Sequence, residues 1–266
     1  MNNTEHLTRF ATLANLSGPF PPNWETLAAL HHVWPHTIPF ENIEVLLNRP
    51  ISTALADITD KLLTRGRGGY CFEHNLLFKQ VLEEAGFSVT PHLARVVWGL
   101  EEPAPTPQTH MLLIVTLNGT RYLADVGFGG VSLPAPLRLE EGEQQGFALA
   151  RTGHDQWLLS LAGPEQKRLM YLFDERPCEQ VDIVVANHFV STHPESLFRH
   201  NLIMAGLREE GQYNLFNQHL AIHGSEEREQ QAQSYSEFKS LVSPFFRRQD
   251  TLSEEDMQSI YAKLSG

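Results

Sequence analysis

An Asn-Gly pair, Asn118 and Gly119, separates two apolar runs, residues 110–117 and 120–126. Asn-Gly readily adopts the left-handed backbone conformations of a two-residue hairpin turn, so the two runs are predicted to form adjacent antiparallel strands. A turn of this length pairs each residue of the first strand with one residue of the second. The hairpin therefore determines which side chains, far apart in sequence, share a face.

In this register His110 and Asp125 lie on the same face as diagonal neighbours, roughly 7–8 Å apart between their Cα atoms. Leu112, Ile114 and Leu123 share that face and would bury the pair. A carboxylate on a buried apolar face needs a hydrogen-bonding partner, and His110 is the candidate. From geometry alone, a catalytic His–Asp pair and a satisfied core pair without a catalytic role are equally favoured.

A cysteine close behind a glycine pair is the second informative feature: Gly68 and Gly69 lie just before Cys71. Apolar periodicity predicts a helix over residues 71–85, with Cys71 in its first turn and Asn75 on the same face. The partial positive charge at a helix N-terminus favours the nucleophilic thiolate. A lone cysteine is more often a small apolar core residue, so both interpretations are open at this point.

Together the three residues fit a nucleophilic triad. Asp125 would hold the orientation and tautomer of His110, and His110 would take the thiol proton of Cys71. The resulting thiolate would attack an acyl carbon, and His110 would then exchange a proton with the second reactant. The triad alone does not identify the acyl donor or the acceptor.

Three glycines follow the second strand, in residues 125–130 (DVGFGG). Consecutive backbone N–H groups in such a loop can form a nest for an anion. The spacing matches neither the dinucleotide-binding nor the phosphate-loop motif, and a tight turn is the more common meaning of such a run. If the loop does bind an anion, its place beside Asp125 would put a phosphate near the triad.

The remaining patterns indicate the order of elements. The start of the chain is predicted to be mostly helical, including a helix that Asn23 caps and Pro35 ends. Short strands are predicted from residue 87 to about residue 185, and the chain closes with a helix that Ser253 caps. This order is typical of an α+β protein. The predicted domains are residues 1–86, 87–188 and 189–266.

Composition limits the class of partner. The 266 residues include 20 Lys and Arg against 32 Asp and Glu, a net charge of −12. Such a chain is not expected to bind nucleic acid non-specifically or to bind an anionic membrane surface. The first residues lack the pattern of a signal peptide and the two cysteines make no disulfide framework, so we expect a cytoplasmic protein. Cys71 and His74 have C-x-x-H spacing, but no second pair of ligands lies at a suitable distance in the sequence, so no metal is expected.

Five segments resemble the arylamine N-acetyltransferase family, most closely its bacterial N-hydroxyarylamine O-acetyltransferase type. They occur in family order and cover most of the first 200 residues. The segments are residues 38–43 (IPFENI), 67–75 (RGGYCFEHN), 109–111 (THM), 124–130 (ADVGFGG) and 187–198 (NHFVSTHPESLF).

The resemblance implies an N-terminal helical bundle, a central β-barrel and a C-terminal α/β lid, within the cysteine-protease and transglutaminase-like superfamily. It implies a catalytic triad of Cys71, His110 and Asp125. Acetyl-CoA would be the co-substrate of a metal-independent ping-pong cycle. The acceptors would be arylamines, arylhydrazines or N-hydroxyarylamines.

The resemblance also assigns binding residues. It places Phe40 and Phe128 beside the aromatic acceptor. The residues that it places near the pyrophosphate of CoA are Gly127, Gly129 and Gly130. Arg67 and Glu41 would be structural and paired with each other.

Two other functions fit the same residues. One is a cysteine hydrolase or an amide-forming acyltransferase with a different acyl donor on the same scaffold, because a triad serves hydrolysis equally well. The other is a non-enzymatic protein that binds CoA or a partner and carries an inactive triad. The expected partners are CoA and small aromatic amines, hydrazines or hydroxylamines, and association into a homo-oligomer is left open.

Overall fold

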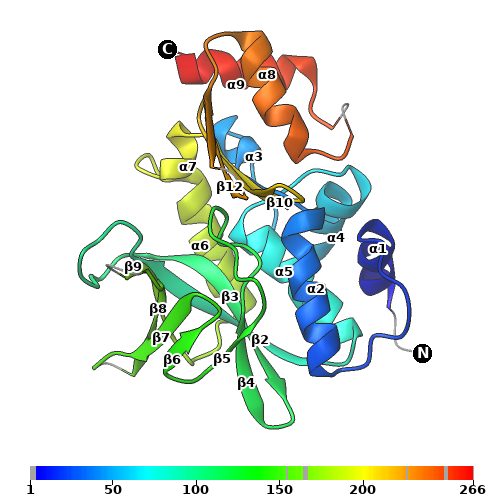
Figure 1. The fold of residues 1–266 in the computed structure, drawn as a ribbon, viewed down its shortest axis with the longest axis vertical. Coiled ribbons are helices and arrows are strands. Elements are labelled where there is room, and N and C mark those ends of the chain that lie inside the picture. The colour runs from blue at the N-terminus through cyan, green and yellow to red at the C-terminus, as the bar shows by residue number, and fades with distance from the viewer. Residues whose placement is uncertain (1–3, 154, 164–166, 226, 249–250, 266) are drawn as a thin grey trace.

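The structure, a computed structural model, describes residues 4–153, 155–163, 167–225, 227–248 and 251–265. Helices from the start of the chain lie beside an eight-stranded sheet, and a five-stranded sheet with two helices lies above both in Figure 1. Within the described ranges, no helix is long and apolar enough to cross a membrane.

The first segment is helical, as predicted. Its elements are α1 (Glu5–Leu13), α2 (Trp24–Thr37), α3 (Ile43–Leu46), α4 (Leu55–Thr59), the π-helical turn η1 (Asp60–Thr64) and α5 (Cys71–Glu84). Asn23 caps α2, because its side-chain oxygen accepts a hydrogen bond from the N–H of Thr26 at 2.9 Å. Gly86 follows α5 with φ +89°, a conformation that glycine adopts without strain.

The predicted end of α2 at Pro35 is wrong, because the helix continues to Thr37. The N–H of Ile38 still donates to the carbonyl of Trp34 at 2.9 Å, so the proline removes only its own hydrogen bond. Trp34 is fully buried and stacks on Phe10, with 4.3 Å between ring centroids. This packing stabilises the last turn in spite of the proline.

The eight-stranded sheet has the order β5-β4-β3-β2-β9-β8-β7-β6 and curls into a nearly closed barrel (Figure 1). Its strands are β2 (Ser88–Val96), β3 (Gln108–Leu117), β4 (Thr120–Ala124), β5 (Leu137–Arg138), β6 (Gly142–Gln144), β7 (Phe147–Arg151), β8 (Gln156–Leu161) and β9 (Arg168–Asp174). The side chain of Gln144 bonds to both the N–H and the carbonyl of Arg138, each at 2.9 Å. These two bonds join the edge strands β5 and β6 where a complete barrel would close.

The predicted hairpin is confirmed. Leu117 pairs with Thr120 across the turn, and Asn118 and Gly119 have φ values of +50° and +79°. Positive φ at both turn residues is what a type I′ turn requires.

Alternate residues of β3 face two different layers, as the period of two in a strand requires. Met111, Leu113 and Val115 pack against the helices, whereas Leu112 and Ile114 belong to the core of the barrel. The strand therefore joins the helical layer to the barrel interior.

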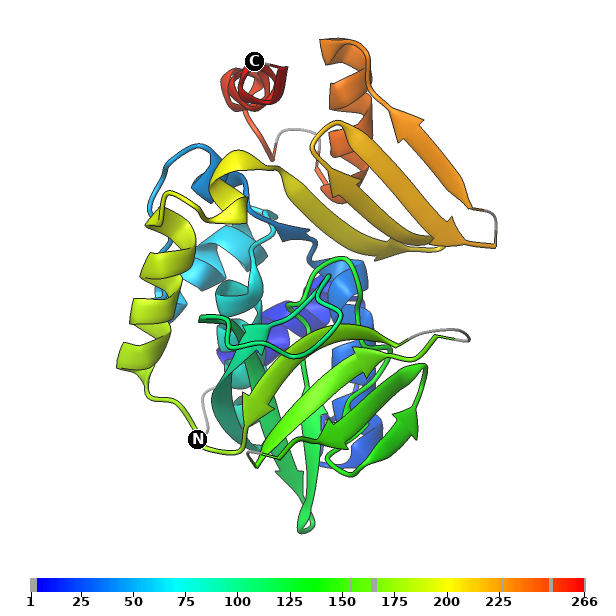
Figure 2. The ribbon, with the colours of Figure 1, turned by 90° about the vertical axis from the view of Figure 1, so that its left-hand side faces the viewer.

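The five-stranded sheet has the order β1-β10-β11-β12-β13. Its strands are β1 (Phe40–Glu41), β10 (Ile203–Arg208), β11 (Gly211–Phe216), β12 (His219–Gly224) and β13 (Arg228–Gln231). Helices α8 (Tyr235–Val242) and α9 (Glu254–Ser265), with the 3-10 turn η2 (Ser243–Phe245), lie beside this sheet (Figure 2). The predicted cap of α9 is confirmed, because Ser253 Oγ accepts from the N–H of Asp256 at 3.1 Å.

The segment between the two sheets differs from the prediction of short strands to about residue 185. Helices α6 (Gln180–Thr192) and α7 (Leu197–His200) occupy it instead. Adjacent β-branched valines favour a strand locally, but Ile183, Ala186 and Val190 are buried at helical spacing, so packing decides the conformation. The predicted boundary at residue 188 falls inside α6, and the division into three domains stays a prediction.

Candidate active site

The position of Cys71 at the start of α5 depends on the two glycines before it. A β-carbon on Gly68 would lie 2.1 Å from the carbonyl oxygen of Pro39, and one on Gly69 would lie 2.7 Å from a carboxylate oxygen in the first turn of α5. Glycine therefore allows the chain to pass closer here than any other residue could. Cys71 is buried, and its thiol lies 3.8 Å from the carbonyl oxygen of Thr109, to which it donates.

The hairpin brings His110 and Asp125 together, as its register predicts. His110 Nε2 and Asp125 Oδ2 are 2.7 Å apart, and both side chains are buried. The Cys71 side chain lies close enough to His110 to contribute to raising the pKa of its imidazole. Because Nε2 of His110 is hydrogen-bonded to Asp125, Nδ1 is the ring nitrogen that is available to exchange a proton with the Cys71 thiol.

The carboxylate of Asp125 receives three further hydrogen bonds. Oδ2 also accepts from the Tyr171 hydroxyl at 3.0 Å, and Oδ1 accepts from the Asn75 amide at 3.1 Å and from the N–H of Gly127 at 2.9 Å. Sequence reasoning missed the roles of Tyr171 and Asn75. The helical face that Asn75 shares with Cys71 was a usable signal, whereas no local pattern connects Tyr171, on β9, with this site.

The pKa values of the pair are those of a buried ion pair. Burial alone would lower the pKa of His110, but the charge and hydrogen bond of Asp125, with a smaller contribution from Cys71, outweigh burial and raise it to about 10. Burial alone would raise the pKa of Asp125, but His110 and the hydrogen bonds from Gly127 and Asn75 lower it overall. The site therefore favours an imidazolium between the carboxylate and the thiol.

The two phenylalanines expected beside the acceptor contact different parts of the site. The half-buried Phe128 ring is perpendicular to the His110 imidazole, with 5.3 Å between ring centroids. Phe40 is buried next to Gly129, where an added β-carbon would lie 3.3 Å from the Phe40 ring. The structure thus brings Phe128 to the imidazole and Phe40 to the glycine loop.

The glycine loop contacts all three parts of the molecule. A β-carbon on Gly127 would lie 2.8 Å from Cα of Cys71, so the loop packs directly on the start of α5. The carbonyl of Gly130 accepts a hydrogen bond from the side chain of Asn214, on β11, at 3.1 Å. Gly129 has φ +93°, which favours glycine. The N–H of Gly127 points to Asp125, so this part of the loop orients the triad.

A cluster of buried charges supports the chain next to Cys71. Arg67 bridges two carboxylates, with 2.9 Å to Glu41 and 2.9 Å to Glu44, and Lys61 lies 2.7 Å from Glu73. The predicted pairing of Arg67 with Glu41 is confirmed. Buried charges are stable only when they are paired in this way.

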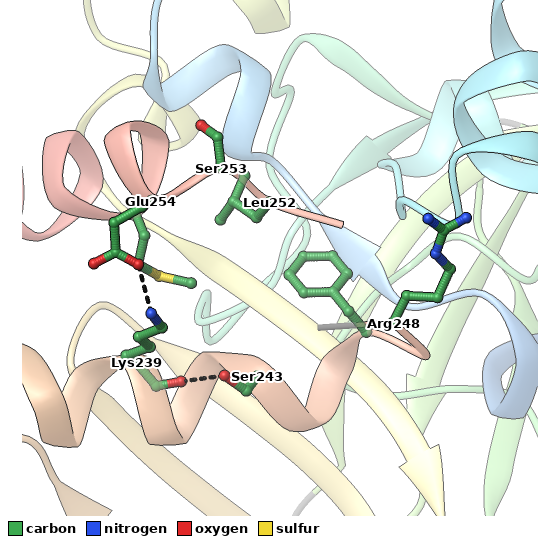
Figure 3. Close-up of a pocket in the computed structure, with 8 residues that line it drawn as sticks. Lys239, Ser243, Arg248, Leu252, Ser253 and Glu254 are labelled. Atoms are coloured by element: carbon green, nitrogen blue, oxygen red, sulfur yellow. Dashed lines mark hydrogen bonds and ion pairs between the residues drawn. The ribbon is translucent and has the colours of Figure 1, made fainter. Parts of the chain in front are cut away.

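Among the described residues, no group of three or more His, Cys, Asp or Glu side chains is placed to hold a metal ion. A cavity of about 320 Å³ lies in a different part of the molecule (Figure 3). Its lining residues are Lys239, Ser243, Phe246, Arg248, Leu252, Ser253, Glu254 and Met257. The ion pair of Lys239 with Glu254 is part of this lining, and no triad residue contributes to it.

Comparison with known proteins assigns the chain to a family. The N-acetyltransferase family model matches residues 23–247. The arylamine N-acetyltransferase of Mycolicibacterium smegmatis is 41% identical over 225 residues, which cover 81% of this chain and 82% of that protein. A Salmonella typhimurium relative, named arylamine N-acetyltransferase / N-hydroxyarylamine O-acetyltransferase, is 42% identical over 206 residues, covering 75% of this chain and 72% of that protein.

The fold agrees with this assignment. The solved structure of Mycobacterium marinum arylamine N-acetyltransferase in complex with CoA matches with a TM-score of 0.89 and 34% identity, covering 97% of this chain and 99% of that chain. The predicted α+β class is thereby confirmed. The chain belongs to the arylamine N-acetyltransferase family.

Proposed function

We propose that this chain moves the acetyl group of acetyl-CoA to the nitrogen of arylamines and arylhydrazines, and to the oxygen of N-hydroxyarylamines, through a thioester on Cys71. The observation that carries the proposal is the buried His110–Asp125 pair, with 2.7 Å between Nε2 and Oδ2, next to the buried Cys71, which contributes to raising the pKa of His110. The names of the Mycolicibacterium and Salmonella relatives support arylamines and N-hydroxyarylamines as acceptors, and the CoA complex of the Mycobacterium marinum protein supports the donor. Arylhydrazines as acceptors rest on the family resemblance of the sequence alone.

In the first half-reaction, Asp125 holds His110 as the imidazolium and Cys71 reacts as the thiolate. The thiolate sulfur attacks the carbonyl carbon of acetyl-CoA, and the bond from that carbon to the sulfur of CoA breaks. His110 gives its proton to the departing CoA sulfur. The products are acetylated Cys71, neutral His110 and free CoA.

In the second half-reaction, the amine nitrogen or hydroxylamine oxygen attacks the thioester carbonyl while neutral His110 takes its proton. The bond between the acetyl carbon and the Cys71 sulfur breaks, and the thiolate–imidazolium pair is restored. Exclusion of water from the buried thioester would favour the amine over hydrolysis.

The contacts around the triad suggest where the substrates bind. Phe128 is half-buried and lies beside the His110 imidazole, so an aromatic acceptor that packs on the Phe128 ring would lie close to the triad. Because the N–H of Gly127 is directed at Asp125, we assign the contact with the CoA pyrophosphate chiefly to Gly129 and Gly130. Phe40 would then shape the acceptor site through Gly129.

We also propose a cellular location and a class of binding partner for this activity. Both cysteines are free thiols, which supports a reducing, cytoplasmic location. The net charge of −12 supports small-molecule partners over nucleic acid or a membrane surface. Association into a homo-oligomer is left open here, as it is by the sequence.

Intact-protein mass spectrometry tests the function. The wild type mixed with acetyl-CoA and no amine is expected to gain one acetyl group, which an arylamine then removes as its N-acetyl product. The Cys71→Ala variant is expected to gain none. A wild type that stays unmodified by acetyl-CoA while other acyl thioesters modify it would contradict the donor. Discharge at the same rate with and without amine would favour the hydrolase.

A further inference from the structure

The backbone that carries Asp125 leaves the sheet directly after β4. The last residue pair of the β3–β4 ladder is Leu113 with Ala124, so the N–H of Asp125 lies beyond it. That N–H donates instead to Nε2 of His31, on α2, at 3.3 Å. The next N–H groups also donate to side chains, that of Val126 to Asn75 Oδ1 at 3.3 Å and that of Gly127 to Asp125 Oδ1 at 2.9 Å.

We propose that His31 is a positioning residue, whose neutral imidazole holds the backbone of Asp125 and thereby aims the carboxylate at His110. The inference rests on the proposed role of Asp125 in acetyl transfer. His31 does not contact the reacting atoms, so it would act only through Asp125.

The hydrogen bonding of His31 is consistent with a role beyond packing. Its side chain is 1% exposed. Because Nε2 accepts a hydrogen bond, a neutral ring must carry its proton on Nδ1. Nδ1 is buried and has no hydrogen-bond partner in the part of the chain that the structure describes. A buried N–H without a hydrogen-bond partner lowers the stability of the fold. If His31 served only to fill space, a leucine would do so without this loss. The favourable contact that only the imidazole provides is the hydrogen bond between Nε2 and the N–H of Asp125.

The charge state of His31 suits the same role. Burial lowers the pKa of His31 to about 4, although the nearby charge of Asp125 acts in the opposite direction. His31 is therefore neutral at the pH where His110 is an imidazolium. A neutral acceptor holds the Asp125 backbone without competing with His110 for the carboxylate.

The tautomer of His31 in the wild type tests the geometry directly. Long-range proton–nitrogen NMR spectra of protein labelled with ¹⁵N-histidine report which ring nitrogen carries the proton. The His31→Gln variant identifies the signals of His31 by their loss. We expect the Nδ1–H tautomer, without titration between about pH 5 and 8. An Nε2–H tautomer or an imidazolium at this residue would overturn the inference, because neither can accept from the Asp125 N–H.

The rate of Cys71 acetylation tests the consequence. His31→Leu removes the acceptor, His31→Gln keeps one, and His92→Leu is a matched control at a buried histidine bonded to Thr90 and Asp174. We expect His31→Leu to slow acetylation by about tenfold or more, because the Asp125 N–H loses its partner. His31→Gln and His92→Leu are expected to stay near the wild-type rate.

The pH profile separates this role from a structural one. If the Asp125 carboxylate is less well aligned with His110, it raises the pKa of His110 by a smaller amount. The loss of activity at alkaline pH should therefore begin at a lower pH in His31→Leu than in the wild type. If His31→Leu keeps the wild-type rate and alkaline limb, the inference is wrong. A wild type that is not acetylated at all would contradict the proposed function instead, and the tautomer measurement would still decide the contact.

Discussion

The two sides of the site are built in different ways. His110 and Asp125 are 15 residues apart and lie on one hairpin, whose two-residue turn sets their register. Cys71, Asn75 and His31 come from helices outside that hairpin, and His31 is 94 residues from its partner. The hairpin side is therefore specified by local sequence, whereas the helical side depends on packing of the whole fold. Variants on each side should differ in whether they change chemistry alone or stability as well.

The largest effect is expected on the hairpin side, for Asp125→Asn. Single-turnover acetylation of Cys71 should slow by roughly 10³–10⁴-fold, because a neutral amide stabilises neither the imidazolium nor the required tautomer. Quenched samples analysed by mass spectrometry give the rate. Asp57→Asn, a change at an exposed residue bonded to Ser52, is the matched control. A loss of less than about tenfold would contradict the assigned role of Asp125.

The next largest effect concerns the helical side, where Arg67→Met should lower the free energy of unfolding by about 3–5 kcal/mol. The change removes the closer of the two cations beside the fully buried Glu41 carboxylate and leaves only Lys61, at 4.0 Å. Urea denaturation followed by circular dichroism measures this free energy of unfolding. The double variant with Glu41→Gln should recover part of the loss, because the poorly paired charge is removed as well. Wild-type stability in Arg67→Met would disprove the structural role of this pair.

Where the two sides meet, Gly127→Ala should cost about 1–3 kcal/mol of unfolding free energy and also slow acetylation. The added methyl group would lie 2.8 Å from Cα of Cys71 and 2.8 Å from the Asn75 amide nitrogen, so one side must move. Gly153→Ala is the matched control, because a β-carbon there would have open space around it. Equal stability and activity of both variants would mean that the loop does not press on α5.

A smaller effect should appear in the pH dependence of stability. The folded-state pKa of His110, about 10, is above its ordinary value of 6.5. Its contribution to stability is therefore complete below about pH 6.5 and is lost as the pH rises through about 10. The difference in unfolding free energy between the wild type and His110→Gln should shrink over this interval. A difference that stays constant would show that the ion pair does not titrate as described.

The sequence predicts the hairpin side of the site better than the contacts that distant elements make with it. The hairpin, the His110–Asp125 pair and the position of Cys71 at a helix start all depend on spacings of a few residues. Tyr171 on β9 and His31 on α2 contact Asp125 only through the tertiary fold, so no local sequence pattern predicts these two contacts.

The errors in secondary structure have the same origin. Pro35 and the valine-rich start of α6 have local preferences for breaking a helix and for forming a strand. Burial of Trp34 in one helix, and of Ile183 and Ala186 in the other, overrides those preferences. Local propensity therefore predicted the elements best where the turn chemistry was strong, as at Asn118 and Gly119.

The most direct test of the central claim is the pH dependence of Cys71 alkylation by iodoacetamide, with Cys178 of the same chain as the internal reference. Burial raises the pKa of the Cys178 thiol to about 11, so its alkylation should increase steadily with pH. Peptide mass spectrometry distinguishes the two sites. The account predicts that Cys71 is alkylated much faster than Cys178 near neutrality, and that Asp125→Asn removes most of this difference in rate. If Cys71 of the wild type is alkylated no faster than Cys178 near neutrality, the claim that the His110–Asp125 pair activates Cys71 is contradicted.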